Sequence, residues 1–60
     1  MSEFAIGDTV QITAQIMKGN VGTVVHLDEK TGKYLVRIGG ATQNYFTAQE
    51  LKKFDATKSQ

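Results

Sequence analysis

The chain has 60 residues, of which 40% are hydrophobic and 22% charged, and its seven basic and six acidic side chains give a net charge of +1. This length allows one small domain at most, and the composition is that of a globular chain rather than a disordered one. The near balance of charge disfavours a dedicated nucleic-acid binder, and the absence of cysteine excludes disulfides and thiolate metal sites.

The N-terminal stretch MSEFAIGD has neither a basic n-region nor an apolar h-region, so we expect no secretory signal. No apolar run further along is long enough to cross a membrane, and we expect no membrane contact. A chain without cysteine suits a reducing compartment, and we therefore expect a cytoplasmic protein.

Strand-like patterns begin at residue 9. Apolar and polar residues alternate over 9–13, and residues 22–27 are rich in β-branched side chains. A polar turn at 28–33 is expected to close a hairpin onto a third strand at 34–38, in which alternate residues share one face. After a Gly-Gly break, residues 43–46 form a short fourth strand.

The end of the chain predicts one helical turn and one last strand. Thr47 and Glu50 have the spacing of a capping box, in which both side chains satisfy amides at the start of a helix. We expect helix to be limited to about one turn near Ala48–Glu50. A short strand or turn at 51–54 follows, and 55–60 is expected to be a flexible polar tail.

These elements predict an all-β domain over 1–54, a five-stranded antiparallel SH3-like barrel with one short helical turn before the last strand. The phenylalanines Phe4 and Phe54 are expected to fill part of its core. The other expected core residues are the apolar residues of the strands, namely Val10, Ile12, Val24, Val36, Ile38, Phe46 and Leu51.

The stretch KGNVGTVVHLD, residues 18–28, places two glycines before a β-branched run. A phosphate-binding loop would need a longer glycine loop followed by a helix, whereas Thr-Val-Val favours a strand. Gly19 is therefore expected to form a turn, and Gly22 to let the second strand bend where the backbone is crowded.

This region resembles a KOW motif, which would extend from Val10 through Ile38 and include Lys18, Gly19, Asn20, Val21, Gly22 and Val24. The chain is also similar to photosystem I subunit IV and to the variable chain of ferredoxin–thioredoxin reductase. The residues that carry this second resemblance are 21–24, Asp28, Lys33, Tyr34, Phe46, Glu50 and Leu51. Both resemblances imply a small SH3-like barrel, a fold that hosts many functions.

Aromatic side chains are the first candidate binding residues. Tyr34 and Tyr45 combine an apolar ring with a polar tip, which is typical of protein interfaces. Tyr45 is expected to anchor a partner-binding surface, with Tyr34, Met17 and Leu35 as its neighbours. Basic side chains are the second set, and possible phosphate contacts are Lys18, Lys30, Lys33 and Arg37.

No catalytic, metal or cofactor site is expected. His26 is the single histidine, and a zinc site needs three or four ligands. Asp28 and Glu29 are adjacent in a turn, where carboxylates are solvated rather than opposed across a substrate.

Three functions remain open, and the one we favour is a non-catalytic module that docks on a protein partner as an accessory or regulatory barrel. The alternative is a KOW-type RNA or ribosome contact made by the basic residues. A remote third is an oligomeric reductase, because Gln43 and Tyr45 match the Gln-x-Tyr strand of type II dihydrofolate reductase, which the chain faintly resembles. The sequence leaves the oligomeric state open.

Overall fold

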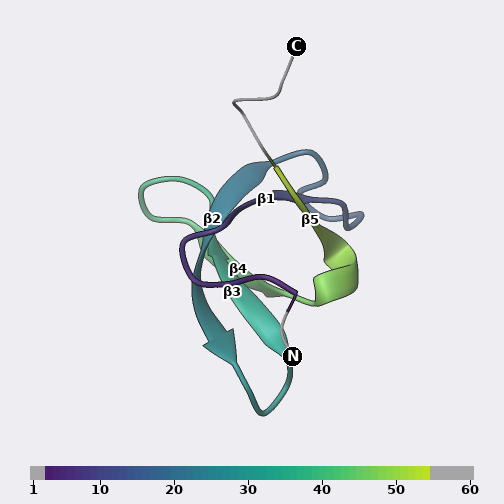
Figure 1. The fold of residues 1–60 in the computed structure, drawn as a ribbon. Helices are drawn as coiled ribbons and strands as arrows, with labels where there is room; N and C mark the ends of the chain where they lie inside the picture. Colours follow the sequence, from purple (N-terminus) through teal and green to yellow (C-terminus); the bar gives the residue numbers. More distant parts are fainter. Residues whose placement is uncertain (1–2, 55–60) are drawn as a thin grey trace.

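A computed structural model describes residues 3–54 as five strands and one short 3-10 helix (Figure 1). The prediction of an all-β chain with five antiparallel strands and a single helical turn is confirmed. The tail predicted at 55–60 lies outside the described residues. In chain order the elements are β1 (Thr9–Ile12), β2 (Val21–Asp28), β3 (Lys33–Arg37), β4 (Gln43–Phe46), η1 (Ala48–Glu50) and β5 (Leu51–Lys53).

All five strands belong to one sheet, with the order β4-β3-β2-β1-β5. Neighbouring strands are antiparallel throughout, and the chain returns after η1 to place β5 beside β1 (Figure 1). The strands β4 and β5 are therefore the two ends of this sheet. Within residues 3–54, no helix has the length and apolar character needed to cross a membrane.

The core lies on one side of the sheet, which we call the inner face. Six of the predicted core residues are buried there, and Phe4 joins them as predicted. Ile38 and Phe54 are only half-buried, against prediction, because each follows the last residue of its strand and lies at the rim of the sheet. The buried residues are Phe4, Val10, Ile12, Val24, Tyr34, Val36, Phe46 and Leu51.

A β-bulge interrupts β2 where it pairs with β3. Val24 lies opposite Val36, but the next pair is His26 with Leu35, so Val25 is the extra residue. Regular alternation from Val24 would turn His26 inward. The bulge instead leaves His26 exposed and places Leu27 opposite the buried Tyr34, where it packs against the core.

Gly22 is crowded, as predicted. A Cβ built on it would lie 2.5 Å from the Arg37 carbonyl oxygen and 2.7 Å from a methyl carbon of Val36. Its φ is not positive, so the need for glycine comes from close packing of β2 on β3 rather than from backbone strain. Gly19 has φ +92° and forms the turn before β2, also as predicted.

The helical turn η1 begins after Thr47. The backbone N–H of Thr47 donates to Oε1 of Glu50 at 2.8 Å, and the backbone N–H of Glu50 donates to the carbonyl of Thr47 at 3.0 Å. The turn then positions β5, since Thr13 N–H donates to the Glu50 carbonyl at 2.8 Å as the chain comes alongside β1. The spacing Thr-x-x-Glu thus marks the start of the turn correctly.

Candidate partner-binding surface

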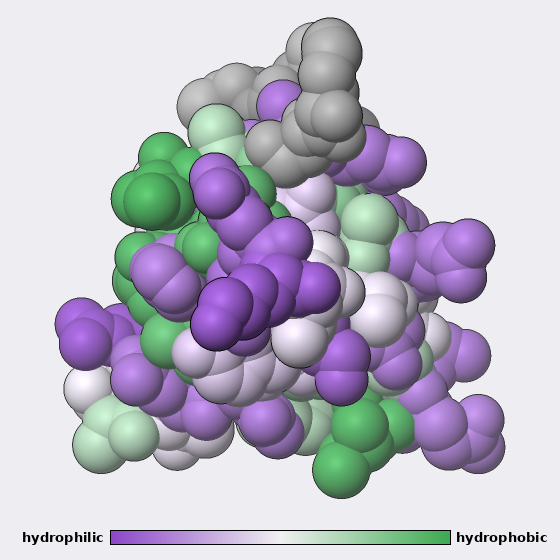
Figure 2. Space-filling view, turned by 90° about the horizontal axis from the view of Figure 1, so that it is seen from below, coloured by the Kyte–Doolittle hydropathy of each residue, from purple (hydrophilic) through white to green (hydrophobic). Residues whose placement is uncertain are grey.

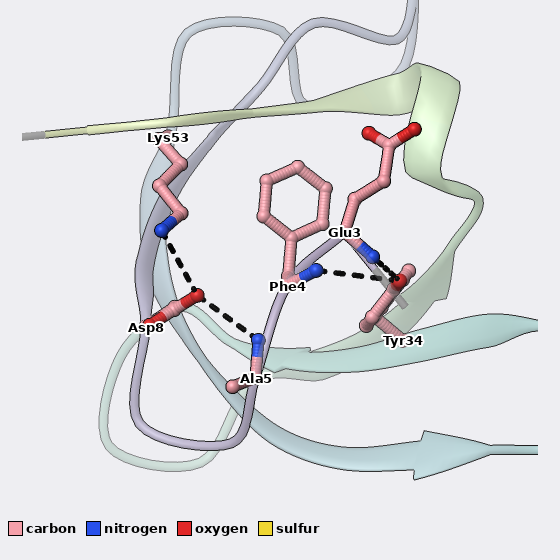
Figure 3. Close-up of polar contacts among 6 residues, drawn as sticks. All are labelled: Glu3, Phe4, Ala5, Asp8, Tyr34 and Lys53. Carbon is pink, nitrogen blue, oxygen red and sulfur yellow. Dashed lines mark hydrogen bonds and ion pairs between the residues drawn. The ribbon is translucent and has the colours of Figure 1, made fainter. Parts of the chain in front are cut away.

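Tyr34 belongs to the core and not to the surface. Its side chain is 3% exposed, and its ring meets that of Phe4 edge to face at a centroid distance of 5.3 Å. The phenol oxygen accepts hydrogen bonds from the backbone N–H groups of Glu3, at 2.9 Å, and Phe4, at 3.4 Å (Figure 3). The prediction that Tyr34 contributes to an exposed surface is therefore wrong, because its polar tip is used to hold the N-terminal segment over the core.

Tyr45 is on the outer face of the sheet, opposite the core. Its side chain is 46% exposed, and β4 places it directly across from Leu35 of β3. The N–H of Ile38 donates to the carbonyl of Thr42 at 2.7 Å, which makes Ile38 and Thr42 a hydrogen-bonded pair. Since such pairs alternate along an antiparallel ladder, Leu35 and Tyr45 form a non-hydrogen-bonded pair, the type in which side chains lie closest.

His26 extends this pair into a row across three strands. It lies opposite Leu35 on β2, as Tyr45 does on β4. The sequence alone could not pair His26 with Leu35, because the bulge that sets this register has no glycine or other marker of its own. The row combines an exposed imidazole, a half-buried leucine and an exposed phenol.

The four basic candidates do not form one cluster in the fold. Lys33 and Arg37 occupy alternate positions of β3 on either side of Leu35, so all three share the outer face. Lys30 is in the turn between β2 and β3, and Lys18 in the loop between β1 and β2. The sheet therefore brings two of the four basic residues to the aromatic row.

Lys33 and Arg37 have no acidic partner in the described part of the chain. Lys33 is paired in register with Asp28, whose Oδ1 accepts a hydrogen bond from the backbone N–H of Lys30 at 3.0 Å. The ion pair that residues 3–54 do contain joins Lys53 Nζ to Asp8 Oδ2, 3.6 Å apart (Figure 3). The charge of Arg37, which lies opposite Thr23, is thus available to an incoming group, while Asp28 offsets part of the charge of Lys33 on the same face.

We call the five residues of this region the outer patch: His26, Lys33, Leu35, Arg37 and Tyr45. Met17, expected beside Tyr45, lies instead in the β1–β2 loop with φ +62°, and packs partly against the core. Gln43 precedes Tyr45 by two residues on β4 and shares its face, opposite Arg37. The sheet thus keeps Leu35 and Tyr45 together and separates them from Tyr34 and Met17.

Other large apolar side chains are exposed away from the outer patch. Ile6, in the N-terminal segment, is 67% exposed, and Ile16, in the β1–β2 loop, is 64% exposed. On the face seen in Figure 2, hydrophobic residues gather in separate areas that are bordered by hydrophilic ones. Single exposed apolar residues are common on monomers, so exposure alone does not mark a site.

No three side chains of His, Asp or Glu among residues 3–54 come together in a group that could hold a metal ion.

Comparisons with protein-family models, with curated proteins and with solved structures found no match to this chain.

Proposed function

We propose that the chain is a non-catalytic SH3-like barrel of the cytoplasm that docks on a protein partner through the outer patch. The observation that carries this proposal is the pairing of Leu35 with Tyr45 on the outer face. There the Tyr45 ring is exposed while its neighbour is half-buried. An aromatic ring held beside an apolar neighbour is the usual centre of a protein interface.

Basic side chains lie beside the Leu35–Tyr45 pair, as charged residues do at the rim of many protein interfaces. Lys33 and Arg37 flank Leu35 on the same strand face, and neither has an acidic partner among residues 3–54. Residues at the rim of an interface mainly change the association rate and the choice of partner, whereas a buried aromatic centre determines the dissociation rate. We therefore assign Tyr45 the role of anchor, and Lys33 and Arg37 the role of selecting an acidic surface.

RNA is a second candidate ligand, and the same arrangement favours it. Base stacking on an aromatic ring beside basic side chains is how many proteins bind single strands. Lys33, Arg37 and Tyr45 share one face in this way. Such binding would weaken steeply with salt, because phosphate contacts release counterions.

Capture from a native lysate separates the two candidates. The full chain is immobilised, and the eluate is compared with and without nuclease treatment of the lysate. Tyr45→Ala removes the anchor, and Ile16→Ala removes a more exposed apolar side chain away from the outer patch as a control. The proposal expects a protein that survives nuclease, is lost with Tyr45→Ala and is kept with Ile16→Ala. A protein that elutes equally from all three baits, or a nuclease-sensitive product, would contradict it.

A further inference from the structure

Within the described part of the chain, the strand β4 has an open edge. It ends the sheet, pairing with β3 on one side, and its residues Gln43, Asn44 and Tyr45 are all exposed. It also carries no charged residue, whereas the opposite end of the sheet, β5, carries Lys52 and Lys53. Charged side chains on an edge strand oppose pairing with another chain, so the two ends of this sheet differ in their readiness to accept a strand.

The hydrogen-bonding groups of this edge follow from the register. Since Ile38 and Thr42 form a hydrogen-bonded pair, Gln43 and Tyr45 are in non-hydrogen-bonded pairs with β3. Their backbone N–H and C=O groups therefore point away from β3, toward the open side. These are the groups that an added strand would bind.

One of these groups already has a partner. The N–H of Tyr45 donates to Oδ1 of the neighbouring Asn44 at 2.9 Å. An added strand would have to displace this amide side chain before it could bind Tyr45 fully. The Asn44 side chain thus occupies one hydrogen-bond donor of the edge, the Tyr45 N–H, and so opposes pairing with unrelated strands.

The charge beside this edge selects the kind of strand. Arg37 is opposite Gln43, and Lys33 is on the same outer face, without an acidic partner in residues 3–54. We propose that β4 binds an extended acidic segment of the partner as a sixth strand, whose acidic side chains lie on the outer face next to Tyr45. This inference rests on the proposed function and names the chemistry of its partner.

A second copy of the chain is a poorer occupant of the same edge. Pairing β4 with β4 would place the Lys33 and Arg37 side chains of both copies on one continuous face and would bring neither of them an opposite charge. An acidic strand meets the same side chains with opposite charge.

The test uses the full chain and the peptide acetyl-Glu-Val-Glu-Val-Glu-Val-Glu-amide, followed by amide chemical shifts. A control peptide has lysine in place of glutamate. Two further isomeric peptides carry N-methyl groups either on the central glutamates or on the central valines. The two sets of N–H groups point to opposite sides of a strand, so only one isomer can keep the hydrogen bonds to β4.

We expect the acidic peptide to shift the amides of Gln43 and Tyr45, and one N-methyl isomer alone to lose binding. Arg37→Glu should weaken the acidic peptide, and Asn44→Ala should strengthen its binding by about two- to fivefold, because Tyr45 N–H is then free. Tyr45→Ala keeps the backbone groups of the edge and should reduce binding without abolishing it.

Four results would overturn the inference: no shift with the acidic peptide at millimolar concentration, equal binding of the two N-methyl isomers, equal binding of the lysine peptide, or dimerisation of the free chain through β4. The proposed function is judged separately by lysate capture. If capture depends on Tyr45 but no peptide adds to β4, the proposed function stands and the partner docks through side chains alone. Capture that ignores Tyr45 would remove the proposed function whatever the peptides do.

Discussion

Tyr34 and Tyr45 place the same side chain in opposite environments. Tyr34 lies on the inner face of β3, where its ring packs on Phe4 and its oxygen accepts two backbone hydrogen bonds. Tyr45 lies on the outer face of β4 with its ring exposed. One tyrosine therefore contributes to stability, and the other is free to contribute to binding.

Replacing these hydroxyls separately tests that division. Tyr34→Phe leaves the N–H groups of Glu3 and Phe4 without their acceptor, and should lower the free energy of unfolding by about 1–2 kcal/mol. Tyr45→Phe is a surface change, and its effect should stay within about 0.5 kcal/mol. Urea denaturation of the two variants measures both values. Equal losses would mean that the Tyr34 phenol does not hold the N-terminal segment.

Gly22 and Gly40 provide a matched pair of glycines. A Cβ on Gly22 would collide with Arg37 and Val36, whereas a Cβ on Gly40 meets nothing within 4 Å. Gly22→Ala should therefore cost about 1–3 kcal/mol, the range for overpacking, and Gly40→Ala should be close to neutral. Thermal denaturation checks this difference, and the same melting temperature for both would show that β2 does not approach β3 this closely.

At the scale of elements, the β3–β4 ladder decides which residues meet. Its register pairs Leu35 with Tyr45 and Arg37 with Gln43, and no other strand of residues 3–54 pairs with the outward groups of β4. Both the apolar pair and the open edge therefore depend on one hairpin. A change of one residue in this register would turn Tyr45 toward the core.

A double-mutant cycle on Leu35→Ala and Tyr45→Ala tests this register. Side chains that face each other in a non-hydrogen-bonded pair should show a coupling free energy of about 0.2–1 kcal/mol in urea denaturation. Thr23, on the outer face of β2 opposite Arg37, serves as the control partner for Tyr45. Strictly additive effects of Leu35→Ala and Tyr45→Ala would contradict the pairing.

The strands could be predicted from the sequence because each has a local signal, such as the alternation in β1 or the β-branched run in β2. The bulge at Val25 could not, because it depends on how β2 curves against β3. The inward position of Tyr34 follows from the alternation over 34–38, which puts it on the same face as Val36. Its hydrogen-bond partners could not be predicted, since they are 30 and 31 residues away in sequence. The candidate surface was therefore half predicted: the Tyr45–Leu35 pair was expected, and His26 was not.

Across the whole molecule, one face of the sheet is buried in the core and the other is turned toward solvent. The inner face holds the core and is covered at one end by the N-terminal segment. Tyr34 holds this segment by accepting hydrogen bonds from Glu3 and Phe4, and Asp8 accepts one from Ala5 within the segment (Figure 3). The outer face carries the outer patch beside an edge without charges. This separation allows the outer patch to be changed with little loss of stability.

Titration of the captured partner against variants of the chain measures whether Tyr45 anchors that partner. Tyr45→Ala should weaken binding by about thirtyfold, which corresponds to a loss of about 2 kcal/mol at an interface centre. The double variant Lys33→Ala/Arg37→Ala should mainly slow association, with a modest dependence on salt. An affinity that is unchanged by Tyr45→Ala, falls with this double variant and decreases steeply with salt would show that Tyr45 is not the anchor, and would assign this face to RNA.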